Sequence, residues 1–124
     1  MANILVVDDS KFMRKMLSDI LIEEAHQILA EAENGKEAIE LYERLKPDLV
    51  TLDIIMPEVE GIDAISALKA MRKANPRAKV VIVSAMGQEK VVEECLQAGA
   101  SGFVVKPFQP SDVTGTVQAV LKVS

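Results

Sequence analysis

Short apolar runs alternate along the chain with segments in which apolar residues recur every three or four positions. Continuous apolar stretches rich in β-branched residues are typical of strands that are covered on both faces. Four such runs occupy residues 4–7, 49–52, 80–83 and 103–105, and a weaker one occupies residues 27–32. The pattern therefore predicts five buried strands.

The segments between these runs have the spacing of helices with one apolar face. Apolar residues recur there at intervals of three and four, which places them along one side of a helix. The five apolar stripes are Met13, Met16, Leu17, Ile20 and Leu21; Ala38, Leu41, Tyr42 and Leu45; Ile62, Ile65, Leu68 and Met71; Val92, Cys95 and Leu96; and Val113, Val117, Val120 and Leu121. Pro47, Pro76 and Gly99 follow the second, third and fourth stripes, and Pro110 precedes the fifth, as expected at helix boundaries.

Strands and helices thus alternate five times, in the order (βα)5. Parallel strands need right-handed crossovers, which place helices on both faces of the sheet. We therefore predict an α/β fold of three layers, in which a doubly wound parallel sheet of five strands lies between helices. With 124 residues, the chain is expected to be one domain spanning residues 1–124.

Composition narrows the class of protein. With 49% hydrophobic and 27% charged residues, the chain has the make-up of a folded globular protein. A domain of this size needs no disulfide, and the single cysteine, Cys95, is interpreted as a packing residue. The net charge of −5 argues against direct binding of nucleic acid. No apolar run is long enough for membrane insertion, and we expect a cytoplasmic protein.

Polar side chains follow four of the five predicted strands. Asp8 and Asp9 come after the first strand, Asp53 after the third, Ser84 after the fourth and Lys106 after the fifth. In open parallel sheets, ligands bind at the carboxyl ends of the strands. We therefore expect these five side chains to form one site.

Three neighbouring carboxylates need either raised pKa values or a cation, because like charges resist joint ionisation. The donors are all oxygens, which favours a hard cation such as Mg²⁺. The only histidine, His26, lies before the second strand and is interpreted as a surface or boundary residue. The sequence therefore predicts a Mg²⁺ site formed by Asp8, Asp9 and Asp53.

Mg²⁺ held by a few carboxylates commonly completes its shell with water and phosphate oxygens, which points to phosphoryl chemistry. A strand-end carboxylate can itself be the nucleophile, so Asp53 would become an aspartyl phosphate, with Lys106 balancing charge and Ser84 adding a contact. The loop after the first strand lacks glycines that would cradle a phosphate. A flavin or nucleotide site is therefore disfavoured.

In this order, the strand-end residues resemble the receiver domains of two-component response regulators, and the resemblance covers essentially the whole chain. The matching pieces are VVDDS at 6–10, LDIIMP at 52–57 with Gly61, VSA at 83–85 and FVVKPF at 103–108. Little sequence follows the fifth helix, so we expect a stand-alone receiver without an output domain. The stretch 84–88 is most similar to receivers of the chemotaxis type, and the resemblance implies the flavodoxin-like strand order 2-1-3-4-5.

The resemblance also implies a role for each site residue. Asp53 would be the phosphoacceptor, Asp9 a direct Mg²⁺ ligand and Asp8 a direct or water-mediated one. Ile55 would offer its backbone carbonyl to the same ion. Ser84 and Lys106 would bind the phosphoryl oxygens, with a cis peptide bond before Pro107.

The implied activity is transfer of a phosphoryl group from a phosphohistidine of a sensor histidine kinase to Asp53, followed by hydrolysis. The protein would be no enzyme beyond catalysing its own phosphorylation and dephosphorylation. The phosphorylated form would bind a flagellar motor switch component or an adaptor, and a phosphatase is a further candidate partner. A monomer is expected, because the helices show no long heptad seam.

Three apolar residues near the site have open interpretations. Phe103 is either a core aromatic or the ring that turns inward when Ser84 approaches the phosphoryl group. Ile55 and Met86 each lie two positions after a site residue, and we hypothesise that they slow hydrolysis of the aspartyl phosphate.

Other functions remain open at this point. One is a phosphorelay intermediate, which would pass its phosphoryl group to another histidine, or another single-domain receiver. A different class is an aspartyl-phosphate phosphohydrolase of the haloacid dehalogenase type. That class needs an acid two residues after its nucleophile, where this chain has Ile55.

Overall fold

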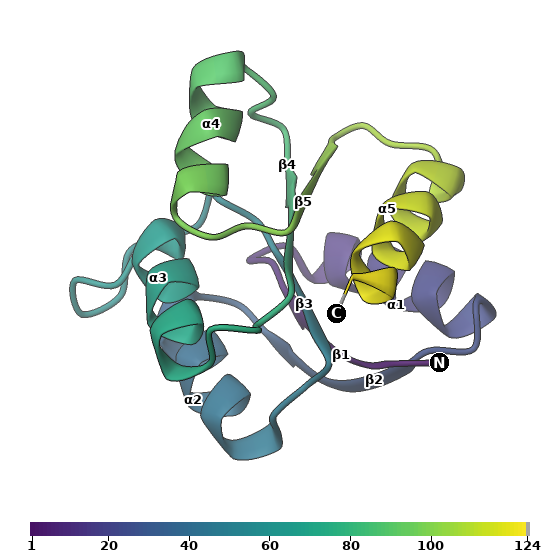
Figure 1. Ribbon diagram of the computed structural model, residues 1–124, viewed down its shortest axis with the longest axis horizontal. Coiled ribbons are helices and arrows are strands. Elements are labelled where there is room, and N and C mark those ends of the chain that lie inside the picture. Colours follow the sequence, from purple (N-terminus) through teal and green to yellow (C-terminus); the bar gives the residue numbers. More distant parts are fainter. Residues whose placement is uncertain (124) are drawn as a thin grey trace.

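Strands and helices alternate strictly in the computed structural model, which describes residues 1–123 (Figure 1). The strands are β1 (Asn3–Val7), β2 (Gln27–Ala32), β3 (Leu49–Leu52), β4 (Val80–Ser84) and β5 (Gly102–Val105). The helices are α1 (Lys11–Glu23), α2 (Gly35–Leu45), α3 (Ala64–Ala74), α4 (Glu89–Gln97) and α5 (Pro110–Lys122). All strand pairs are parallel, in the order β2-β1-β3-β4-β5, which confirms the predicted fold class and strand order.

The sheet is the middle of three layers. Side chains alternate between the faces of a strand, so in β1 Leu5 and Val7 belong to one core cluster while Ile4 and Val6 belong to the other. The first cluster joins the sheet to α2, α3 and α4, and the second joins it to α1 and α5. Figure 1 shows these two groups of helices on opposite sides of the strands.

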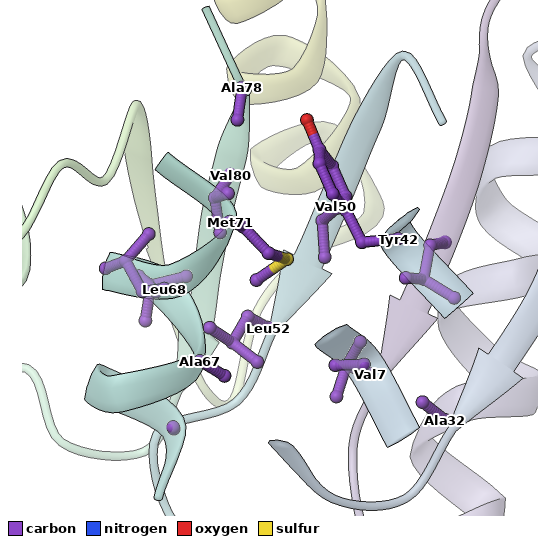
Figure 2. Packing of buried hydrophobic residues seen from close by; sticks show 14 of the residues in the cluster. Val7, Ala32, Tyr42, Val50, Leu52, Ala67, Leu68, Met71, Ala78 and Val80 are labelled. Atoms are coloured by element: carbon purple, nitrogen blue, oxygen red, sulfur yellow. The ribbon is translucent and has the colours of Figure 1, made fainter. Parts of the chain in front are cut away.

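The cluster beneath α2 and α3 is centred on β3. Tyr42 of α2 and Met71 of α3 lie beside Val50 and Leu52, and all four are buried (Figure 2). The Tyr42 hydroxyl accepts a hydrogen bond from the Asn75 side chain at 3.2 Å. This bond links the end of α3 to α2 at the amino-terminal edge of the sheet.

The third helix begins two residues later than its apolar stripe predicts. Asp63 caps it by accepting a hydrogen bond from the Ser66 backbone N–H at 2.8 Å. Ile62 lies before the cap and pairs with Val59 in a short antiparallel bridge. Its apolar side chain still packs against the core, which explains why the stripe extends beyond the helix.

The apolar stripe predicted for the fourth helix is only partly correct. Cys95 is fully buried, and burial raises the pKa of its thiol, in agreement with its interpretation as a packing residue. Leu96, however, is 51% exposed, and Val91 and Ala98 pack against the core. The helix is therefore rotated about its axis relative to the expected stripe.

His26 directly precedes β2, at the amino-terminal edge of the sheet and away from the strand-end carboxylates. Its Nδ1 accepts a hydrogen bond from the Ala2 backbone N–H at 3.0 Å. Burial, assisted by the N-terminal charge, lowers the pKa of this imidazole. His26 is thus a boundary residue. Among residues 1–123, no helix combines the length and apolar character needed to cross a membrane.

Candidate functional site

The carboxyl ends of the two central strands bring the acidic residues together. Val7 of β1 pairs with Leu52 of β3, so Asp8 and Asp53 leave the sheet side by side. Asp9 completes a group in which one carboxylate oxygen from each residue lies within 4.8 Å of the other two. Asp8 and Asp53 are buried and Asp9 is exposed, so the group opens to solvent on one side.

Backbone N–H groups hold the two buried carboxylates. Asp8 Oδ1 accepts from the Ser10 N–H at 2.9 Å, and Asp53 Oδ1 accepts from the Ile55 N–H at 3.1 Å. Each bond spans two residues and forms a tight turn after its strand, a common role for aspartate. The turns fix one oxygen of each carboxylate, so the orientation of both groups is set by the backbone.

Lys106 reaches the remaining oxygens from the end of β5. Its Nζ lies 2.8 Å from Asp8 Oδ2 and 3.0 Å from Asp53 Oδ2. The peptide bond between Lys106 and Pro107 is cis, as the resemblance implied. One ammonium therefore bridges two carboxylates that would otherwise repel each other.

Burial dominates the titration of the central carboxyl. Desolvation raises the pKa of Asp53, and the hydrogen bonds from Ile55 and Lys106 only partly oppose it. Burial also lowers the pKa of the Lys106 ammonium, but the bonds and charges of Asp8 and Asp53 outweigh burial and leave that pKa raised. The lysine is therefore protonated, and a further cation would stabilise the ionised form of Asp53.

The structure places the other predicted site residues less directly. Ser84 ends β4 and is fully buried, but its Oγ accepts from the Met86 N–H at 3.3 Å, not from a site residue. Ile55 contributes its N–H to Asp53, while its side chain is 51% exposed. Phe103 is half-buried and packs against the α2–α4 side of the core.

Arg14 is a neighbour of the site that the pattern of strand ends did not predict. Its Nη1 donates to the Asp8 backbone carbonyl at 2.7 Å, and its Nε pairs with Glu31 at 2.8 Å. A cation in the first turn of a helix is electrostatically unfavourable. The position of Arg14 there is therefore the sequence signal that could have pointed to a specific contact. Arg14 ties α1 and β2 to the end of β1.

The donor set fits a hard divalent cation. Three carboxylates offer oxygens only, one of them exposed to solvent, as Mg²⁺ with its retained waters requires. Among residues 1–123, no cysteine or histidine belongs to this group. The chemistry of the donors thus matches Mg²⁺ better than zinc or copper.

Residues 4–118 match the response regulator receiver domain family. The chain belongs to this family. Among curated proteins, this receiver domain is 53% identical to the chemotaxis protein CheY of Thermotoga maritima over 121 residues, which cover 98% of this chain and 96% of that protein. It is 47% identical to CheY of Bacillus subtilis over 118 residues, which cover 95% and 96% of the two chains.

Among solved structures, a similar chain is found in the CheX–CheY–BeF3–Mg+2 complex from Borrelia burgdorferi. That chain is 38% identical with a TM-score of 0.90, and the match covers 95% of this receiver domain and 87% of the other chain. These comparisons favour a CheY-type receiver over the phosphorelay and phosphohydrolase alternatives.

Proposed function

We propose that this receiver domain is a phosphorylation switch of the chemotaxis type, in which Asp53 takes a phosphoryl group from a histidine kinase in the cytoplasm. The observation that carries the proposal is the bridge of Lys106 between Asp8 and Asp53, beside the exposed Asp9. This arrangement supplies a nucleophile, a fixed ammonium and an oxygen-only cation site in one place. The family membership supports the same function.

The chain's own residues would carry out the transfer. The Asp53 carboxylate attacks phosphorus and the bond from phosphorus to the kinase imidazole nitrogen breaks. The imidazole already carries a proton on its other ring nitrogen, so it leaves as a neutral base. The Lys106 ammonium, which donates to Asp53 Oδ2, would balance charge on the transferred phosphoryl oxygens. In hydrolysis, water attacks phosphorus and the acyl phosphate bond breaks, which restores the carboxylate and releases inorganic phosphate.

Asp8, Asp9 and Asp53, together with the Ile55 carbonyl, would hold the Mg²⁺. When bound, that ion supplies charge neutralisation to the phosphoryl oxygens. The Ser84 hydroxyl would turn from the Met86 N–H to the phosphoryl group, and Phe103 would follow it inward. This motion would alter the face made by α4, β5 and α5.

The downstream partners are proposed from the relatives. Since the CheY relatives are named chemotaxis proteins, we propose a motor switch component or an adaptor as the target of the phosphorylated form. The complex that pairs CheX with CheY supports a further protein partner, and we propose a phosphatase as one candidate. We propose that the domain acts alone and as a monomer.

Intact mass spectrometry tests the central step. The protein is incubated with Mg²⁺ and acetyl phosphate, alongside Asp53→Asn and a sample without Mg²⁺. The proposal expects a gain of one phosphoryl group that both controls lose. No gain by folded wild-type protein in the presence of Mg²⁺ would refute it.

Two apolar side chains at the rim are proposed to slow hydrolysis. Ile55 is half-exposed beside Asp53, and Met86 is half-buried in the β4–α4 loop. We expect Ile55→Asn with Met86→Gln to shorten the lifetime of the aspartyl phosphate several-fold, because polar groups would orient the attacking water. Release of inorganic phosphate after removal of the donor measures the rate, with the exposed Leu96→Gln as the control. An unchanged rate would exclude this role.

A further inference from the structure

Two hollows lie at the amino-terminal edge of the sheet, opposite the carboxylate site. The first, of about 700 Å³, is bounded by Tyr42, Pro47 and Leu121 among others. The second, of about 430 Å³, lies between Leu96, Val120 and Val123. The segment 76–79, between α3 and β4, separates them and contributes to both. We call this pair of hollows the base groove.

Positive charge is concentrated around the base groove. Its lining includes four basic residues, Lys46, Arg72, Arg77 and Lys79, against one acidic residue, Asp48. The rest of the chain has ten basic residues against eighteen acidic ones. The groove is therefore a cationic surface on an otherwise strongly acidic molecule.

These cations have no acidic partner in the part of the chain that the structure describes. Among residues 1–123, no carboxylate lies within 4 Å of the four basic groups. Backbone carbonyls position two of them: Arg72 donates to Ala78 at 2.9 Å, and Lys79 donates to Leu121 at 3.2 Å. The one acidic group of the lining, Asp48, accepts from the Asn3 N–H at 2.8 Å. Two of the four cations are thus held in place, and within the described residues the charge of none of the four is paired with a carboxylate.

Apolar side chains lie between the cations. In the second hollow Leu96 is 51% exposed and Val123 is 65% exposed, whereas Pro47 and Tyr42, which border the first hollow, are buried. A bare phosphate would use the cations and leave this apolar surface in water. A nucleic acid would be repelled by the acidic remainder of the molecule. The surface instead matches a short polypeptide segment in which carboxylates alternate with aliphatic side chains.

We propose that the base groove binds an acidic, leucine-containing segment of a protein partner. Because the groove lies at the opposite edge of the sheet from Asp53, such a partner would leave the phosphorylation site accessible. The interaction would therefore anchor the domain in both the phosphorylated and the unphosphorylated state. Ion pairs with Lys46 and Arg77 would make the affinity fall with salt.

The test is a titration of the ¹⁵N-labelled chain with a capped peptide of sequence Glu-Leu-Glu-Glu-Leu-Glu. The changes in the amide chemical shifts of the protein measure binding. We expect saturable shifts at Lys46, in segment 76–79 and near Val123, with the amide of Asp53 unmoved. The double charge reversal Lys46→Glu with Arg77→Glu should weaken binding about tenfold. The matched control, Lys69→Glu with Lys90→Glu, changes the net charge equally at exposed lysines elsewhere and should bind within about twofold of wild type.

Several outcomes would overturn the proposal. They are the absence of peptide binding, equal weakening by both double variants, or shifts confined to other surfaces. Tripolyphosphate binding the same amides at least as tightly would identify a site for small anions instead. Concentration-dependent shifts of these amides in the protein alone would identify a second copy as the occupant. The dispersion of the amide spectrum of each double variant checks folding without phosphorylation, so this result is separate from the fate of the proposed switch.

Discussion

Thr51 carries a hydroxyl in a place that favours a methyl group. It is fully buried in the middle of β3, and its Oγ1 has no hydrogen-bond partner within residues 1–123. Its neighbours across the sheet are Val6 and Val81, both members of the apolar cluster under α1 and α5. We therefore expect Thr51→Val to stabilise the fold, because valine has the same branched shape without the unpaired polar atom.

The expected size follows from the burial of this group. An unsatisfied buried hydroxyl costs about 1–3 kcal/mol, and replacement of the hydroxyl by a methyl group should recover about 1–2 kcal/mol of that. A chain of 124 residues unfolds with an entropy of about 0.26 kcal/mol/K, so Tm should rise by about 4–8 °C. Urea unfolding would give the gain in free energy, with the slope unchanged.

Thr51→Ser is the matched control, since it keeps the hydroxyl and removes the methyl group. We expect it to lower the free energy of unfolding by about 1 kcal/mol. Opposite signs for the two variants would identify the hydroxyl as the destabilising atom. A valine variant that is no more stable than wild type would refute the reasoning and indicate that the hydroxyl has a partner. The phosphoryl gain should be unaffected by either change.

Three further predictions concern stability. Because burial raises the pKa of Asp53, the folded state binds the proton of this carboxyl more tightly than the unfolded chain does. The ionised carboxylate therefore destabilises the fold increasingly as pH rises. Asp53→Asn should stabilise the fold more at pH 7.5 than at pH 4.5 in urea unfolding, and a larger gain at the lower pH would contradict this. The lowered pKa of His26 gives the opposite pH dependence. The neutral imidazole contributes to the free energy of unfolding above the unfolded pKa near 6.5, and this contribution is lost as pH falls through the folded pKa. The wild-type free energy of unfolding should thus drop between pH 8 and 5 by more than that of His26→Gln, and equal slopes would exclude His26 as the cause. A Cβ at Gly102 would lie 2.9 Å from Thr116 Cγ2 and 3.1 Å from a Val120 methyl. Gly102→Ala should therefore lower the free energy of unfolding by about 1–3 kcal/mol. Thr116→Ser should recover part of this loss in a double-mutant cycle, and additive effects of the two substitutions would contradict the clash.

The central strands could be predicted from the sequence because both of their faces are buried. In β3 all four residues are buried, so the apolar run is continuous. The edge strand β2 has one fully buried residue, and its pattern is correspondingly weak. The strand order was not contained in the periodicity and came from the resemblance to receiver domains.

The sequence could predict the part of the site in which the strand backbone alone brings the side chains together. Asp8 and Asp53 follow paired strands, so their proximity results from the register. Two other contacts could not be predicted in this way. The Ser84 hydroxyl accepts from the Met86 N–H because of its side-chain rotamer, and the bond from Arg14 to the Asp8 carbonyl depends on the rotation of α1 about its axis. The lining of the base groove comes from well-separated parts of the chain, so only the folded structure brings its charges together.

The fourth helix is held to the rest of the domain differently from its neighbours. In α3 four residues are buried, whereas in α4 Cys95 is the only one. Little apolar surface would therefore be exposed to water if α4 shifted or frayed, so its local opening free energy is a small part of the global one. A displacement of α4 would therefore cost less free energy than a similar displacement of α3, and would leave more of the sheet's packing intact.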